Sequence, residues 1–114
     1  LAQTGSYPNK PLRMIVPFSP GGSADNLART LQPGLAGVLG QQIVLDNRGG
    51  ASGIIGTELA QKAPADGYTM LLITTTYTVV PSLVKKLSFD PVKDFSGVSL
   101  VVSQPNVLAV HPSV

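Results

Sequence analysis

Apolar residues gather along the chain in short continuous runs that are separated by stretches with helical spacing. Residues 12–18 form one such run, interrupted only by Arg13, and residues 42–46 and 68–74 form two more. Short runs without polar alternation are typical of strands that are buried on both faces, as in a parallel sheet covered by helices. We therefore predict strands at these three places.

A helical pattern lies between the first two runs. From Ser23 onward, apolar side chains recur on one helical face, at Leu27, Leu31, Leu35, Val38 and Leu39. Pro33 and Gly34 fall inside this pattern, so we expect a kink or a break there. Gly40 is well placed to end the helix.

The rest of the chain continues the alternation of helices and strands. Helices are predicted over residues 54–63 and within 75–87, the latter with Pro81 near its start, and strands over 98–102 and 106–110. Strands that alternate with helices imply parallel pairing and right-handed crossovers. The predicted fold class is α/β, with three layers built around an open, mostly parallel sheet.

Residues 1–11 are predicted to be an extended lead-in, because Pro8 and Pro11 fix φ and remove backbone donors. If small or apolar residues preceded the chain, Ala2 would end an A-x-A signal-peptidase site. The same N-terminal residues are explained equally well as a frayed end of the chain or as residues added by cloning. Residues 12–114 are enough for one domain with a modest core.

Composition excludes several classes of function. The eight Lys and Arg residues are scattered apart from Lys85 and Lys86, without the basic stripe and interleaved aromatics of a nucleic-acid binder. The absence of cysteine rules out disulfides, cysteine nucleophiles and thiolate metal sites. His111 is the only histidine, no close acidic cluster accompanies it, and no G-x-S-x-G elbow occurs. We therefore expect no metal, no cofactor and no catalysis.

Nucleotide binding has weak support. The pair Gly21-Gly22 follows the first strand, but the third glycine of a dinucleotide fingerprint is missing. Gly50, Gly53 and Gly56 have the wrong spacing for that fingerprint, and there is no Walker A sequence. A nucleotide-binding α/β enzyme domain stays an alternative, as does a ligand sensor that signals to a partner protein.

Loops rich in glycine, serine and threonine follow each of the first three predicted strands, at residues 17–23, 47–52 and 74–78. In open parallel sheets, ligands bind beyond the carboxyl ends of the strands, near the point where strand order reverses. The predicted ligand-binding residues come from these loops and the helix start that follows the first one: Phe18, Ser19, Pro20, Gly21, Gly22, Ser23, Ala24, Gly50, Ser52, Thr74 and Thr75.

The first loop, PFSPGGSAD, runs directly into a predicted helix. The first turn of a helix carries unpaired N–H groups and partial positive charge, which suit a carboxylate as well as a phosphate. Gly21 and Gly22 remove side chains from the approach, while Ser19 and Ser23 add hydroxyl donors. The simpler alternative is that Ser23 is a plain N-cap and the glycines serve only the turn.

Two charged residues beside these loops are predicted to support them. Asp25 is expected to hold the loop through backbone N–H groups or to pair with Arg48, although it could also accept from a ligand hydroxyl or ammonium group. Arg48 either pairs with Asp46 or Asp25, or gives the cleft positive potential. Ser52 is expected to cap the second helix.

Several motifs in order resemble the Bug family, the extracytoplasmic solute receptors of tripartite tricarboxylate transporters. They are YPNKPLRMIVPFSPGGSADNLAR, VLDNRGGASGIIGTELAQKAPADGYTMLL, KKLSFDPVKDFSGVSLV and PNVLAVHPS. The resemblance implies an exported, periplasmic binding protein of the two-lobed type II fold, which traps a small organic carboxylate and delivers it to membrane permease subunits. It also implies that backbone amides of residues 17–25, partly through ordered water, hold one ligand carboxylate.

The chain departs from the family pattern in two respects. Residues 77–84 read YTVVPSLV, where members of the family often carry His or Asn before a Pro-Ser-Leu-Tyr element. The chain is also less than half as long as family members, so it is expected to hold most of the first lobe only. We expect such a lobe alone to bind ligand weakly and to self-associate through its uncovered face.

Overall fold

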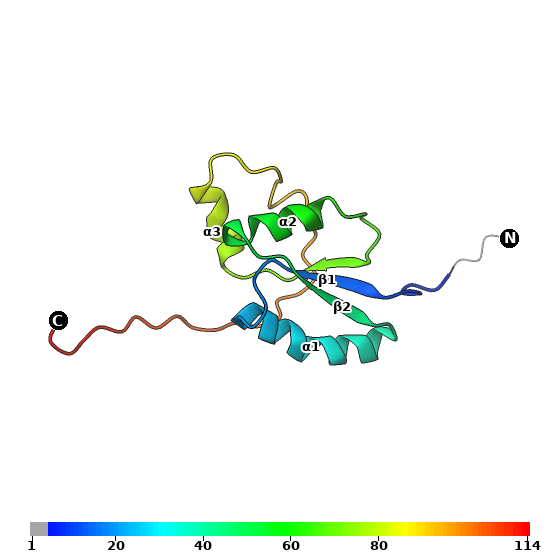
Figure 1. The fold of residues 1–114 in the computed structure, drawn as a ribbon, viewed down its shortest axis with the longest axis horizontal. Helices are drawn as coiled ribbons and strands as arrows, with labels where there is room; N and C mark the ends of the chain where they lie inside the picture. Colours follow the sequence, from blue (N-terminus) through cyan, green and yellow to red (C-terminus); the bar gives the residue numbers. More distant parts are fainter. Residues whose placement is uncertain (1–4) are drawn as a thin grey trace.

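Three parallel strands form the centre of the protein, whose computed structural model describes residues 5–114 (Figure 1). They are β1 (Leu12–Val16), β2 (Ile43–Asn47) and β3 (Thr69–Leu71), and their order in the sheet is β2-β1-β3. On β1, Leu12 lies opposite Ile43 of β2, and Arg13 lies opposite Thr69 of β3. The predicted parallel α/β sheet is confirmed, with the first strand at its centre.

Helices cover both faces of the sheet, which gives the predicted three layers. Helix α1 (Ser23–Leu39) packs against β1 and β2, whereas α2 (Ile54–Gln61) packs against β1 and β3 on the other side (Figure 1). The core between α1 and the sheet is made of buried aliphatic side chains: Leu12, Met14, Val16, Ala24, Ala28, Ile43 and Leu72. Burial of these side chains from water fixes the position of α1, and hence of its N-terminus.

Helix α1 continues through Pro33 without the expected break. Proline removes the hydrogen bond to the carbonyl four residues earlier, here that of Arg29. Pro33 lies on the exposed side of α1, where water can solvate such a carbonyl, while Leu35 and Leu39 continue the packing against the core. Gly40 ends the helix as predicted, with a left-handed φ of 67° and its amide bonded to the carbonyl of Ala36.

A glycine brings α2 into direct contact with the ends of β1 and β2. A Cβ atom on Gly56 would lie 2.6 Å from the carbonyl oxygen of Arg48 and 2.7 Å from Cα of Pro17. The short 3-10 turn η1 (Ala51–Gly53) precedes α2. This close approach holds the loops that follow β1 and β2 side by side.

The third helix, α3 (Thr76–Leu83), lies inside the predicted range, but Pro81 is in its last turn and not near its start. The Tyr77 hydroxyl donates to the carbonyl of Pro91 at 2.6 Å, and the Tyr77 ring stacks edge-on against Phe95 at a centroid distance of 6.0 Å. These contacts hold residues 88–95 against α3.

The predicted strands at 98–102 and 106–110 are not found. Both segments are exposed and have no regular secondary structure, and residues 106–110 lie in the C-terminal end that leads away from the sheet in Figure 1. A strand needs a neighbour for its backbone N–H and C=O groups, and within residues 5–114 these segments have none. Strand β3, which had the strongest apolar run, is only three residues long and pairs with β1 alone.

The possible cleavage site at Ala2 lies outside the described residues, so the export prediction from this site stays a prediction. Among residues 5–114, no helix is long and apolar enough to cross a membrane.

We predict that Gly56→Ala lowers the free energy of unfolding by about 1–3 kcal/mol, because the added methyl group would overlap backbone atoms that cannot easily move. The matched control is Gly37→Ala in α1, where an added Cβ meets nothing within 4 Å. That substitution should stabilise the protein by up to about 1 kcal/mol. Urea unfolding of both variants tests this, and a neutral Gly56→Ala would contradict the close approach.

Candidate ligand-binding site

The loop between β1 and α1 borders an open cavity of about 650 Å³. The opposite wall comes from the residues after β3, so the cavity lies beyond the carboxyl ends of two adjacent parallel strands, where open α/β sheets bind ligands. Its lining consists of Phe18, Ser19, Pro20, Gly21, Gly22, Ser23, Ala24, Thr74, Thr75, Thr76 and Gln104. Nine of these eleven residues are predicted from the sequence; Thr76 and Gln104 are not.

Residues at the start of α1 belong to this lining. The N-cap of the helix is Gly22, with no side-chain cap, so the alternative that Ser23 is the N-cap is wrong. The amide of Gly22 closes a turn with Ser19, whereas within residues 5–114 no acceptor is paired with the amides of Ser23 or Ala24. Such orphan N–H groups at a helix start, together with the helix dipole, attract negatively charged oxygens.

The buried carboxylate of Asp25 holds the loop from behind and is only 2% exposed. Its Oδ2 accepts from the amide of Gly21 and from Nε of Arg29, both at 2.9 Å, and its Oδ1 accepts from Nδ2 of Asn47 at 3.0 Å. Asn47 also donates to the carbonyl of Phe18 at 3.3 Å. The loop is therefore tied to both α1 and the end of β2.

These hydrogen bonds keep Asp25 ionised. The bond from Arg29 contributes most and the bond from the Gly21 amide comes next; together with Asn47 they overcome the effect of burial and lower the pKa of Asp25 to about 2. Asp25 thus pairs with one loop amide, that of Gly21. The φ of Gly21 is 86°, a left-handed conformation that glycine adopts without strain.

Arg48 turns away from the cavity and pairs with Asp46, Nε to Oδ1, at 2.7 Å. Nε of Arg13 bonds the other oxygen of Asp46 at 2.8 Å. Burial alone would raise the pKa of Asp46, but the bonds from the two arginines outweigh it, so the pKa lies below its ordinary value. Arg48 was expected to pair with Asp46 or Asp25, and it forms its ion pair with Asp46. Asp25 forms its ion pair with Arg29 instead.

Two of the predicted ligand-binding residues lie away from the cavity. Gly50 lines neither cavity, because its backbone packs against Ile55, whose Cδ1 would lie 2.6 Å from a Cβ on Gly50. Ser52 has a left-handed φ of 57° inside η1 and does not cap α2, whose N-cap is Gly53. The loop after β2 therefore curls under α2 and does not extend over the cavity.

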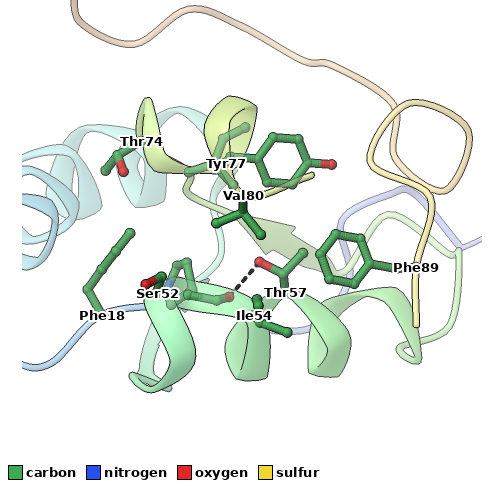
Figure 2. A pocket seen from close by; sticks show the side chains of 11 residues that line it. Phe18, Ser52, Ile54, Thr57, Thr74, Tyr77, Val80 and Phe89 are labelled. Carbon is green, nitrogen blue, oxygen red and sulfur yellow. Dashed lines mark hydrogen bonds between the residues drawn. The ribbon is translucent and has the colours of Figure 1, made fainter. Parts of the chain in front are cut away.

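A second, much smaller crevice of about 10 Å³ lies between α2 and α3 (Figure 2). Figure 2 shows Ile54 and Thr57 of α2 on one side and Tyr77 and Val80 of α3 on the other. The Thr57 hydroxyl donates to the carbonyl of Gly53 at 2.8 Å. Ser52 belongs to this crevice, whose other lining residues are Pro17, Phe18, Gly53, Ile73, Thr74 and Phe89.

The larger cavity offers hydrogen bonds rather than reactive groups. Its lining contains backbone amides, serine and threonine hydroxyls and one glutamine, but no charged side chain. Within residues 5–114, no group of three or more acidic or histidine side chains is placed to hold a metal ion. Neutral donors in this arrangement suit reversible capture of an anion.

Three residues of the site were not predicted from the sequence: Gln104, which lies far along the chain from the predicted loops, Thr76 and Asn47. Thr76 follows two predicted threonines and was recognisable as part of the same loop. Asn47 was placed in a glycine-rich turn without a role, because its contact with Asp25 joins side chains 22 positions apart. Only the pairing of β2 beside β1 brings Asn47 to Asp25.

Comparison with known proteins identifies the family of this chain. A family described as the tripartite tricarboxylate transporter family receptor matches residues 27–114. Protein BugT of Bordetella pertussis is 44% identical over 109 residues, which are 94% of this chain and 33% of BugT. The chain thus spans about a third of the length of this curated relative.

Solved structures give the same result. The structure of the periplasmic binding protein BugD superposes with a TM-score of 0.75 at 42% identity, over 78% of this chain and 30% of BugD. MatC from Rhodopseudomonas palustris, solved with bound malate, has a TM-score of 0.71 at 34% identity, over 78% of this chain and 31% of MatC. At these identities the likeness extends to the family and is not limited to the fold.

We predict that Asp25→Asn lowers the Tm at neutral pH by more than about 5 °C, because the ionised acceptor that binds Gly21 and Arg29 is lost. A depressed pKa means that stabilisation by Asp25 is complete above pH 3.8 and is lost as the pH falls toward about 2. The stability gap between wild type and variant should therefore close over this interval.

Urea unfolding at a series of pH values measures this gap. Asp66→Asn is the control, since Asp66 is exposed and accepts only from the amide of Tyr68. At neutral pH, Asp66→Asn should lower the free energy of unfolding much less than Asp25→Asn does. A gap for Asp25→Asn that stays constant down to pH 2 would show that the carboxylate charge does not hold the loop.

Proposed function

The chain belongs to the tripartite tricarboxylate transporter receptor family, also called the Bug family, and we propose that it forms most of the N-terminal lobe of a periplasmic solute receptor. Residues 1–11 would lead into this lobe and residues 12–114 would make up the lobe itself. The partial length relative to BugT supports a single lobe of a two-lobed protein.

The proposed ligand is a small organic carboxylate, seated on the loop between β1 and α1. The observation that carries this proposal is that Ser23 and Ala24, whose amides have no acceptor among the described residues, line the cavity. Bonds from such donors to an ionised oxygen are about twice as strong as bonds between neutral groups. The malate bound by MatC is a carboxylate of this kind.

A carboxylate suits the seat better than a phosphate does. The carboxylate of Asp25 lies directly behind the loop and its charge is offset by a single partner, Arg29. The surroundings are therefore close to neutral and offer no second cation to balance a dianionic phosphate. The missing third glycine also argues against the nucleotide-binding alternative.

The wider roles follow from the family. We propose that the protein is exported to the periplasm, delivers its ligand to the membrane permease subunits of a tripartite transporter, and binds without catalysing a reaction. Weak ligand binding and self-association of the isolated lobe stay predictions.

Ser23 offers a way to remove one amide donor without disturbing the helix. It is the first residue of α1, where proline is well tolerated, and Gly22 before it is extended, as a residue preceding proline should be. We predict that Ser23→Pro in the complete gene product weakens carboxylate binding by about tenfold to a hundredfold, as expected for a lost hydrogen bond to a charged group.

The matched control is Ser23→Ala, which removes the hydroxyl but keeps the amide and should weaken binding much less. Calorimetry with a panel of organic acids, and with nucleotides for comparison, measures both variants. Equal affinities for Ser23→Pro, Ser23→Ala and wild type would exclude the amide seat. Binding of nucleotides but of no organic acid would overturn the carboxylate assignment itself.

A further inference from the structure

The small crevice between α2 and α3 adjoins the proposed carboxylate seat. Phe18 and Thr74 are the two residues that line both cavities. In Figure 2 both lie at the same side of the crevice, with Phe89 at the opposite side. The two cavities are thus neighbours, and the wall between them is made from these two side chains.

The Phe18 ring is the larger part of this wall. Its tip, Cζ, lies 3.6 Å from the place that a Cβ on Gly53 would occupy, so the ring reaches across the loop end to η1. The backbone of Phe18 belongs to the loop between β1 and α1, which is the proposed carboxylate seat, and its carbonyl accepts a hydrogen bond from Asn47. The same residue therefore supports the seat through its backbone and closes the crevice through its side chain.

Behind the ring, the crevice is mainly apolar. Its walls carry Ile54, Ile73, Val80 and Phe89, and Tyr77 directs its hydroxyl away to the carbonyl of Pro91. The remaining space of about 10 Å³ is close to the least that holds one water molecule. A ligand group larger than a water molecule can enter this crevice only if the Phe18 ring moves.

We propose that the Phe18 ring closes an apolar subsite and thereby restricts the receptor to compact carboxylates that are unbranched beside the bound carboxylate group. This inference rests on the proposed carboxylate seat and specifies which carboxylates can bind there. Ligands with an alkyl or aryl branch at the carbon next to the carboxylate would meet the ring. Shortening the side chain at position 18 would connect the two cavities and admit such a branch.

A matched series of ligands tests this in the complete gene product. Succinate, 2,3-dimethylsuccinate and 2,3-diphenylsuccinate carry the same two carboxylates, and in the two branched acids the carbon beside each carboxylate carries the branch, so either end presents it to the ring. Calorimetry at neutral pH compares wild type with Phe18→Ala and with the milder Phe18→Leu. Phe95→Ala is the control, because Phe95 is an aromatic residue of the same size that lines neither cavity.

We expect wild type and Phe95→Ala to bind succinate at least about tenfold more tightly than 2,3-diphenylsuccinate, a discrimination typical of a steric pocket. In Phe18→Ala the ratio of the two affinities should fall by at least about tenfold, and Phe18→Leu should have an intermediate ratio. If the alanine variant does not fold, Phe18→Leu alone tests the inference.

Other results would overturn the inference. If succinate binds but the ratio of its affinity to that of 2,3-diphenylsuccinate is the same in wild type, Phe18→Leu and Phe18→Ala, the ring does not set specificity, while the carboxylate seat stands. If the same fall in ratio occurs in Phe95→Ala, the effect is a general loosening of the lobe. If none of the three acids binds to any form, the proposed function fails together with the inference.

Discussion

The buried carboxylate of Asp25 is the contact on which the site depends. It joins the amide of Gly21 in the β1–α1 loop, the guanidinium of Arg29 one helical turn along α1, and the side chain of Asn47 at the end of β2. Each partner comes from a different element, so a single ionised group fixes the loop against the sheet and the helix. Hydrogen bonds to a buried charge are costly to break, which makes this arrangement rigid.

This rigidity supports our proposal that a loop without charged side chains holds an anion. The amides of Ser23 and Ala24 are already directed by α1, and Asp25 and Asn47 hold the chain before them, so little conformational entropy is lost when a ligand binds. Gly56 adds to the same effect, because its contact with Pro17 and Arg48 keeps the second loop tight beneath α2. The fold thus prepares the donors before the ligand arrives.

Local patterns predicted much of this and non-local contacts explain the rest. Apolar runs and helical spacing located β1, α1 and the stop at Gly40, because these features depend on neighbours in sequence. The strands expected at 98–110 failed because apolar composition does not supply a partner strand. The role of Asn47 and the turning away of Gly50 and Ser52 depend on how β2 and α2 pack, which no local pattern records.

Nuclear magnetic resonance of the ¹⁵N-labelled complete gene product during a succinate titration tests most directly whether the loop amides receive the carboxylate. We predict saturable shifts of the backbone amide signals of Ser23 and Ala24, with smaller shifts for Gly22, which closes a turn with Ser19, and for Gly21, which is bonded to Asp25. Saturable binding of succinate that leaves the signals of Ser23 and Ala24 unmoved would contradict the proposed seat.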